Sequence, residues 1–163
     1  RGRDVVTAAR PGFPKIVLAS DHGGVELKED LIAFLSGRGY PVADLGTDSA
    51  EPVDYPDYGF AAAGMIRRGE ALRAILICRS GIGMAIAANK SRGVRAALVS
   101  TEPEAELSRR HNDANVLVLG ADGIPRARAR RLVAAWLAAP FDAGRHRRRV
   151  DKIRRFERAH WKD

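Results

Sequence analysis

Short apolar segments alternate along this chain with amphipathic segments, and this alternation restricts the possible folds more than any other feature. Five segments have the length and composition of buried strands: residues 15–20, 42–45, 73–78, 94–99 and 116–119. Helical patterns separate them, predicting helices over residues 25–37, 58–68, 84–89, 103–110, 129–137 and 146–160. Strands that alternate with helices predict an α/β fold: a single-domain, doubly wound, five-stranded parallel sheet with helices on both faces. We expect a flavodoxin-like sheet, whose strand order these patterns leave open.

Composition and charge divide the chain into three parts. Residues 1–14, which contain Pro11, Gly12 and Pro14 and no periodicity, are expected to be a flexible leader, and residues 15–145 to be the α/β domain. Residues 146–163 are expected to form a C-terminal basic helix on the same domain or on a partner subunit. The net charge of +8 comes from the C-terminal end, because residues 125–163 hold 13 Lys and Arg against 4 acids. Such a segment fits a solvated helix, an acidic ligand, a membrane surface or a nucleic acid.

Several classes of protein are excluded or disfavoured. One cysteine cannot form a disulfide framework, and four scattered histidines leave no metal-ligand cluster. The chain has no apolar run near the roughly 18 residues that span a bilayer. The basic segment lacks interleaved aromatic residues and any nucleic-acid-binding motif, which makes a nucleic acid an unlikely partner. We therefore expect a soluble, cytoplasmic protein without metal or membrane anchor.

Ligands of parallel α/β sheets bind beyond the carboxyl ends of the strands, so we expect functional residues to gather at that edge. Asp21 and His22 follow the first strand and precede Gly23 and Gly24. They place a carboxylate and an imidazole at a helix N-terminus, where an anion is favoured. In the alternative interpretation, Asp21 caps the helix and His22 is exposed.

Cys78 ends the third strand and precedes Arg79 and the glycine-rich segment 81–84. A helix start and a nearby arginine favour a thiolate, so Cys78 could be a nucleophile or a base. The consecutive N–H groups of segment 81–84 could bind a phosphate or an oxyanion. Alternatively Cys78 is a small hydrophobic residue. A dinucleotide-binding motif is disfavoured because Ile86 occupies the position of its third glycine.

Two further groups follow later elements. His111 and Asn112 lie at the end of a predicted helix, where His111 could be a general acid or base or part of a polar helix end. Arg145 and Arg149 are four residues apart, so they would share a helix face and could hold a phosphate.

Together these segments resemble the ribose-5-phosphate isomerase B family, which also includes galactose-6-phosphate isomerase subunits. The similarity runs from about Lys15 to Ile153 and rests on short motifs in a characteristic order. These motifs are residues 20–24 (SDHGG), 54–56 (DYP), 75–78 (ILIC), 81–84 (GIGM), 87–90 (AANK), 111–115 (HNDAN) and 144–146 (GRH).

The resemblance implies an aldose–ketose isomerase that works through an enediolate without metal or organic cofactor. It implies that His111 opens the sugar ring, that Cys78 moves the proton and that Ser80 assists it. The remaining implied contacts are the enediolate oxygen with Gly81, Ile82, Gly83 and Met84, the hydroxyls with Asp21, Tyr55 and Asn112, and the phosphate with His22, Arg145 and Arg149. It also implies a homodimer or homotetramer with the active site at the subunit interface.

Two residues depart from the family pattern. Arg79 stands where many members have glycine, and Asp122 stands where many have a phosphate-binding arginine. We hypothesise that Arg79 compensates, by pairing with Asp122 or by reaching the anionic end of the ligand. Alternatively, Asp122 turns outward, and Arg145 and Arg149 suffice.

The departures leave other functions open. A tetrose phosphate, a hexose phosphate or an unphosphorylated sugar could replace the pentose phosphate. The chain could also be an inactive relative that needs another subunit, or a non-catalytic module that binds polyanions through the Arg-rich tail.

Overall fold

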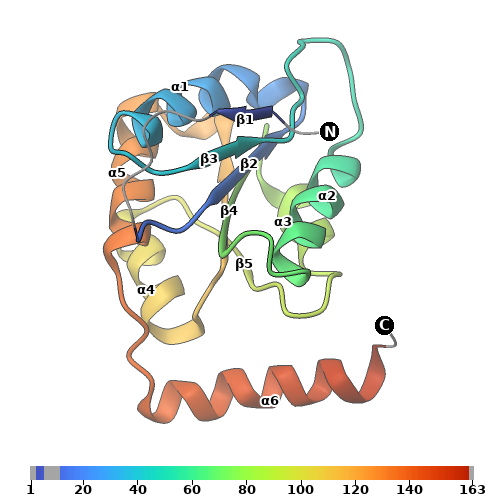
Figure 1. The fold of residues 1–163 in the computed structure, drawn as a ribbon, viewed down its shortest axis with the longest axis vertical. Coiled ribbons are helices and arrows are strands. Elements are labelled where there is room, and N and C mark those ends of the chain that lie inside the picture. Colours follow the sequence, from blue (N-terminus) through green and yellow to red (C-terminus); the bar gives the residue numbers. More distant parts are fainter. Residues whose placement is uncertain (1–2, 6–11, 162–163) are drawn as a thin grey trace.

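The computed structural model, which describes residues 3–5 and 12–161, contains a six-stranded sheet (Figure 1). Five strands run parallel, as predicted: β2 (Ile16–Ser20), β3 (Val42–Asp44), β4 (Arg73–Cys78), β5 (Ala96–Leu98) and β6 (Val116–Gly120). The structure adds β1 (Arg3–Val5), which pairs antiparallel with β3 at the sheet edge. Three residues of the expected leader therefore belong to the sheet, while residues 1–2 and 6–11 lie outside the described part of the chain.

The strand order explains which loops meet at the carboxyl edge. The order is β1-β3-β2-β4-β6-β5, so β6 lies between β4 and β5. The flavodoxin order would place β5 beside β4 instead, so the sheet differs from that order at this edge. Because β4 and β6 are neighbours with Cys78 opposite Gly120, the segments that follow them lie side by side. The N–H of Asp122 accordingly donates to the carbonyl of Arg79 at 3.1 Å.

Alternate residues of the central strands pack on two helical layers. On one face, Ile75 and Ile77 of β4 belong to a core with α1 (Val25–Ser36), α4 (Glu102–Asn112) and α5 (Arg126–Ala138). On the other face, Leu76 and Cys78 pack with α2 (Tyr55–Arg67) and α3 (Ile82–Ala88). Both layers are visible in Figure 1. This alternation is why the thiol of Cys78 lies on the α3 side of the sheet.

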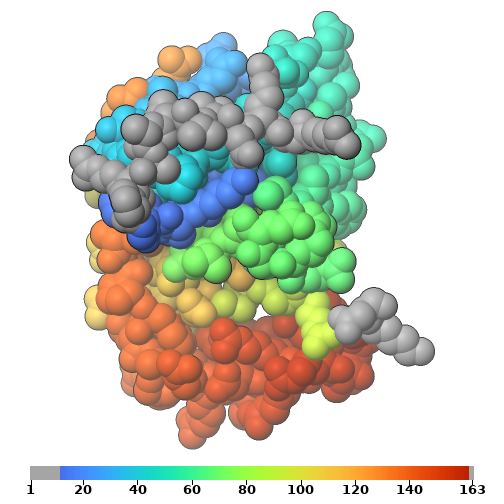
Figure 2. Space-filling view, in the orientation of Figure 1, coloured from blue at the N-terminus to red at the C-terminus, as the bar shows by residue number. Residues whose placement is uncertain are grey.

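The last helix, α6 (Gly144–His160), lies along one end of the molecule, as Figures 1 and 2 show. Val150 is buried, the side chain of Glu157 accepts from the N–H of Gly93 at 3.1 Å, and α6 contacts α4. The predicted C-terminal helix therefore packs on its own domain.

Two short 3-10 turns complete the carboxyl edge. They are η1 (His22–Gly24), which follows β2, and η2 (Ala121–Gly123), which follows β6. With the loop after β4 they form the edge that the sequence predicts to bind a ligand.

Candidate functional site

The thiol of Cys78 lies under a turn of backbone donors at the carboxyl end of β4. Cys78 is 4% exposed, and its Sγ accepts a hydrogen bond from the N–H of Gly81 at 3.1 Å. Gly81 has φ +78°, and a Cβ there would lie 2.4 Å from Cδ1 of Leu98. A left-handed backbone without a side chain is therefore required to turn this N–H toward the sulfur.

The same turn begins α3 and exposes further polar groups. The hydroxyl of Ser80 accepts from the N–H of Ile82 at 3.3 Å. The ring of Tyr55 packs on Gly83, where an added Cβ would lie 2.5–3.0 Å from three ring carbons. Tyr55 precedes the helix predicted over residues 58–68, but α2 already starts at this residue. The structure thus brings Ser80, Tyr55 and the amides of segment 81–84 to one place.

Asp21 and His22 lie on the neighbouring turn η1. A carboxylate oxygen of Asp21 accepts from the N–H of Gly23 at 2.9 Å, so this residue caps the turn. Nδ1 of His22 accepts from the N–H of Val53 at 3.2 Å. The neutral imidazole that accepts at Nδ1 carries its proton on Nε2, which makes that nitrogen a donor.

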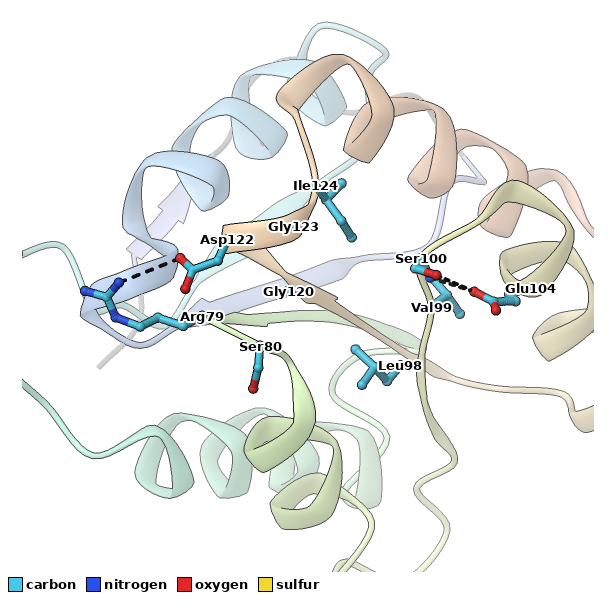
Figure 3. Close-up of a pocket in the computed structure, with 10 residues that line it drawn as sticks. All are labelled: Arg79, Ser80, Leu98, Val99, Ser100, Glu104, Gly120, Asp122, Gly123 and Ile124. Atoms are coloured by element: carbon cyan, nitrogen blue, oxygen red, sulfur yellow. Dashed lines mark hydrogen bonds and ion pairs between the residues drawn. The ribbon is translucent and has the colours of Figure 1, made fainter.

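Arg79 and Asp122 form an ion pair at the mouth of a cavity of about 490 Å³ (Figure 3). Nη1 of Arg79 lies 3.7 Å from Oδ1 of Asp122, and the two side chains are 64% and 62% exposed. Of the two ways in which Arg79 could compensate for Asp122, the structure contains the pairing. The cavity continues past Ser80 to Leu98 and Ile124.

His111 does not lie at this edge, and the expectation that it would is wrong. It belongs to the last turn of α4, which leads into β6 at the end where β4 begins: the N–H of Ala74 donates to the carbonyl of Asn115 at 3.0 Å. Strand β4 has six residues and spans roughly 17 Å. Within one chain, therefore, Cys78 and His111 lie at opposite ends of the sheet.

At that opposite end, His111 stacks on His146 of α6, with ring centroids 4.1 Å apart and an interplanar angle of 4°. Nε of Arg145 donates to Nε2 of His146 at 3.4 Å. Burial, and then the charges of His111, Arg145 and Arg149, lower the pKa of His146. Asn112, Arg145 and Arg149 are exposed near this stack. The residues to which the resemblance assigns roles thus form two groups within one chain. One surrounds Cys78 at the carboxyl edge, and the other surrounds His111 at the opposite edge.

A cluster around Asp113, which no sequence motif predicts, fixes the turn after His111. Asp113 has φ +49° and forms ion pairs with Arg95 at 3.0 Å, Arg109 at 2.8 Å and Arg154 at 3.4 Å. Arg109 also donates to the carbonyl of Ala114 at 2.7 Å. Arg109 is four residues from Asp113, whereas Arg95 precedes β5 and Arg154 lies in α6, too far along the chain to leave a local pattern.

A second unpredicted pair lies beneath the carboxyl edge. Nζ of Lys28, which is 1% exposed, donates to both carboxylate oxygens of Asp44 at 2.6 and 2.7 Å. Asp44 also accepts from the N–H of Gly46 at 2.9 Å. The pair links α1 to β3. Lys28 occupies the i+1 position after Leu27, so its burial breaks the apolar pattern that predicts the helix.

Neither a membrane span nor a metal cluster is found among the described residues. None of the helices in residues 12–161 is both long and apolar enough to cross a bilayer. The described His, Cys, Asp and Glu side chains form no group of three or more that could hold a metal ion.

Comparison with known proteins gives matches over most of the chain. The sequence model of the ribose/galactose isomerase family matches residues 16–153. Ribose-5-phosphate isomerase B of Escherichia coli is 44% identical over 143 residues, covering 88% of this chain and 96% of that protein.

Solved structures agree with the sequence comparison. The Clostridium thermocellum ribose-5-phosphate isomerase B has a TM-score of 0.88 at 46% identity, over 90% of this chain and 99% of that one. A Mycoplasma genitalium ribose-5-phosphate isomerase B with bound ribulose-5-phosphate has a TM-score of 0.87 at 40% identity, over 91% of this chain and 99% of that one. The chain therefore belongs to the ribose/galactose isomerase family.

Proposed function

We propose that this protein is an aldose–ketose isomerase that interconverts ribose 5-phosphate and ribulose 5-phosphate or a close analogue. The observation that carries the proposal is the contact between Cys78 and Gly81. A buried sulfur faces an N–H at 3.1 Å in a turn whose following amides begin α3. A base beside preorganised backbone donors is what proton transfer through an enediolate requires.

In the proposed reaction the thiolate of Cys78 removes the proton from C2 of the open-chain aldose. The C–H electron pair forms the C1–C2 double bond, and the carbonyl pair moves to the oxygen on C1, giving the enediolate. Return of the proton to C1, with transfer of a proton from the O2 hydroxyl to O1, gives the ketose. The amides of Gly81, Ile82, Gly83 and Met84 would stabilise the enediolate oxygen, and Ser80 would assist the base.

The other residues that the resemblance singles out suit the rest of a sugar phosphate. The carboxylate of Asp21 and the hydroxyl of Tyr55 can bind sugar hydroxyls, as can the amide of Asn112. Nδ1 of His22 accepts from the N–H of Val53, so its Nε2–H would be the donor to an anion. Arg145 and Arg149 would supply the positive charges that a phosphate dianion needs.

A second copy of the chain would complete this site. His111, Asn112, Arg145 and Arg149 are about one strand length from Cys78 in their own chain, so the proposal requires them from another subunit. Exposed apolar side chains near the carboxyl edge support such an interface: Ile82 and Ile86, one helical turn apart, and Leu98 are 56%, 57% and 42% exposed. Exposed apolar groups of this kind mark protein interfaces. The proposed assembly is therefore a homodimer or a homotetramer.

Asp122 bears on which sugar the proposed isomerase prefers. Asp122 brings a carboxylate to the cavity mouth, and a carboxylate accepts hydroxyl groups more readily than it tolerates phosphate. The alternative substrates are therefore an unphosphorylated sugar, or a four- or six-carbon sugar phosphate whose phosphate would lie at a different distance from this residue.

The experiment is an isomerisation screen of four-, five- and six-carbon aldose and ketose phosphates in deuterated water. We expect turnover of at least one pair with deuterium incorporated at C2 of the aldose. Unphosphorylated ribose serves as the control for the phosphate requirement. Absence of turnover for every sugar phosphate would contradict the proposal.

A further inference from the structure

The cavity beside the Cys78 turn has an unusual balance of charge for a site that would hold an anion. Three charged side chains line it: Arg79 and Asp122 at one end and Glu104 at the other (Figure 3). Two are acidic and one is basic. A phosphate dianion entering this end of the site would therefore meet a net negative lining.

The carboxylate of Glu104, the third residue of α4, is held by donors at the start of that helix. Its carboxylate accepts from the N–H of Ser100 at 2.7 Å, the hydroxyl of Ser100 at 3.1 Å and the N–H of Thr101 at 3.0 Å. These bonds, the backbone bond from Ser100 first, lower the pKa of Glu104. Because these donors hold the carboxylate of Glu104, Asp122 is the acidic group that we take to act on an incoming anion.

The geometry of the ion pair between Arg79 and Asp122 indicates little contribution to the stability of the fold. Both side chains are more than 60% exposed and the charged atoms are 3.7 Å apart, and such pairs add little to stability. The stem of Arg79 nevertheless follows a defined path over η1, since a Cβ at Gly23 would lie 2.5 Å from its Cγ. The path brings the guanidinium to Asp122, at the end of the cavity opposite Glu104 (Figure 3).

We infer that Arg79 is a specificity-determining residue that acts through Asp122. It neutralises the carboxylate at the cavity mouth and thereby allows an anionic substrate to enter, without itself holding the anionic group. This inference rests on the proposed function and deepens it. Without Arg79, an unpaired carboxylate close to a dianion in a water-exposed site would weaken binding roughly three- to ten-fold.

The test is a double-mutant cycle of the full-length chain: the parent, Arg79→Gln, Asp122→Asn and the double variant. For each protein, kcat and KM are measured with the sugar phosphate that the parent converts fastest, at low and high salt. The Kd for ribose 5-phosphate is measured in parallel by calorimetry. Arg79→Lys tests rescue by another cation, and Arg68→Gln, which breaks the exposed pair with Glu70, is the matched control.

We expect Arg79→Gln to raise KM and Kd three- to ten-fold at low salt, less at high salt, with kcat within two-fold of the parent. Arg79→Lys restores the parent values, and Arg68→Gln retains them. In the Asp122→Asn background, Arg79→Gln has no further effect, because the carboxylate that Arg79 neutralises is gone.

Other outcomes overturn the inference. If Arg79→Gln weakens binding as much in the Asp122→Asn background, Arg79 holds the anion directly. An unchanged KM, or a fall in kcat alone, also contradicts it, as does a parent that does not bind ribose 5-phosphate. A parent that binds the sugar phosphate with the expected Kd pattern but converts none refutes the proposed isomerase and leaves the inference intact.

Discussion

The two ends of the sheet present different kinds of polar group: backbone amides at the carboxyl edge and side chains at the opposite edge. At the carboxyl edge the proposed functional groups include the backbone amides of segment 81–84, of which the N–H of Gly81 donates to the buried sulfur of Cys78. At the opposite edge they are long side chains on α4 and α6, arranged around the stack of His111 on His146. The difference indicates a division of labour. Fixed backbone donors suit the stabilisation of a developing charge, whereas exposed side chains on helices can be presented to another copy of the chain.

Removal of the thiol should have the largest effect. Cys78→Ala is expected to lower turnover about 10³-fold or more, because it deletes the base of the proposed reaction. The loss should appear in exchange of the C2 proton with solvent, measured by NMR, while the Kd for the sugar phosphate changes little. Alanine fits the buried position, so the melting temperature should stay close to that of the parent. Retained proton exchange would exclude Cys78 as the base.

The buried ion pair beneath the carboxyl edge should have the next largest effect. Asp44→Ala leaves the ammonium of Lys28, 1% exposed, without its carboxylate, and should lower the free energy of unfolding by about 3–5 kcal/mol. Arg154→Ala at the opposite edge is the comparison, because Arg154 is 39% exposed and should cost less than about 1 kcal/mol. Urea titrations measure both. Similar losses in the two variants would show that burial does not distinguish the pairs.

His111→Ala should have a smaller effect that depends on the form of the sugar. As the proposed ring-opening acid, His111 is expected to contribute about 10²-fold to turnover of a cyclic substrate. An open-chain sugar phosphate that cannot cyclise, such as a four-carbon one, should be converted at nearly the parent rate. Stopped-flow kinetics with both substrates gives the comparison. Equal losses for the two would argue against ring opening.

The pH dependence of stability should show the smallest effect. Burial and the nearby positive charges lower the pKa of His146 in the folded state, so the unfolded chain binds a proton at higher pH. Stability from neutral His146 is therefore complete above the unfolded pKa of about 6.5 and decreases as pH falls toward the folded pKa. His146→Gln should lose less melting temperature than the parent between pH 7.5 and 5.0. The exposed His160→Gln is the control, and parent-like acid sensitivity of His146→Gln would contradict the assignment.

The sequence predicts the fold well because its signals are local. The apolar run of β4 and the spacing of Leu27, Leu31 and Leu35 define a buried strand and a helix face without reference to the rest of the chain. Thr101 likewise predicts the start of α4, where the structure has a complete capping box with Glu104. The order of β5 and β6 is not local, because it depends on how two edges pack.

The candidate site shows the same limit. Residues at the end of a strand, such as Cys78, are where the strand pattern places them. His111 lies in the last turn of α4, and the direction of that helix returns it to the opposite edge, so its position depends on topology. Lys28 and Asp113 have partners from distant segments. The pairing of Arg79 with Asp122 could be proposed from charge alone, but its geometry required β6 to lie next to β4.

The most direct test of a site shared between two copies is subunit complementation between Cys78→Ala and His111→Ala. Each variant is purified separately, and the two are unfolded together, refolded and assayed with ribose 5-phosphate. If the opposite edges of two copies form each site, a mixed dimer contains one site with both residues intact. Random pairing should then restore about a quarter of parent activity, with each variant refolded alone as the control. Activity in the mixture no higher than the average of the two controls would contradict a shared site.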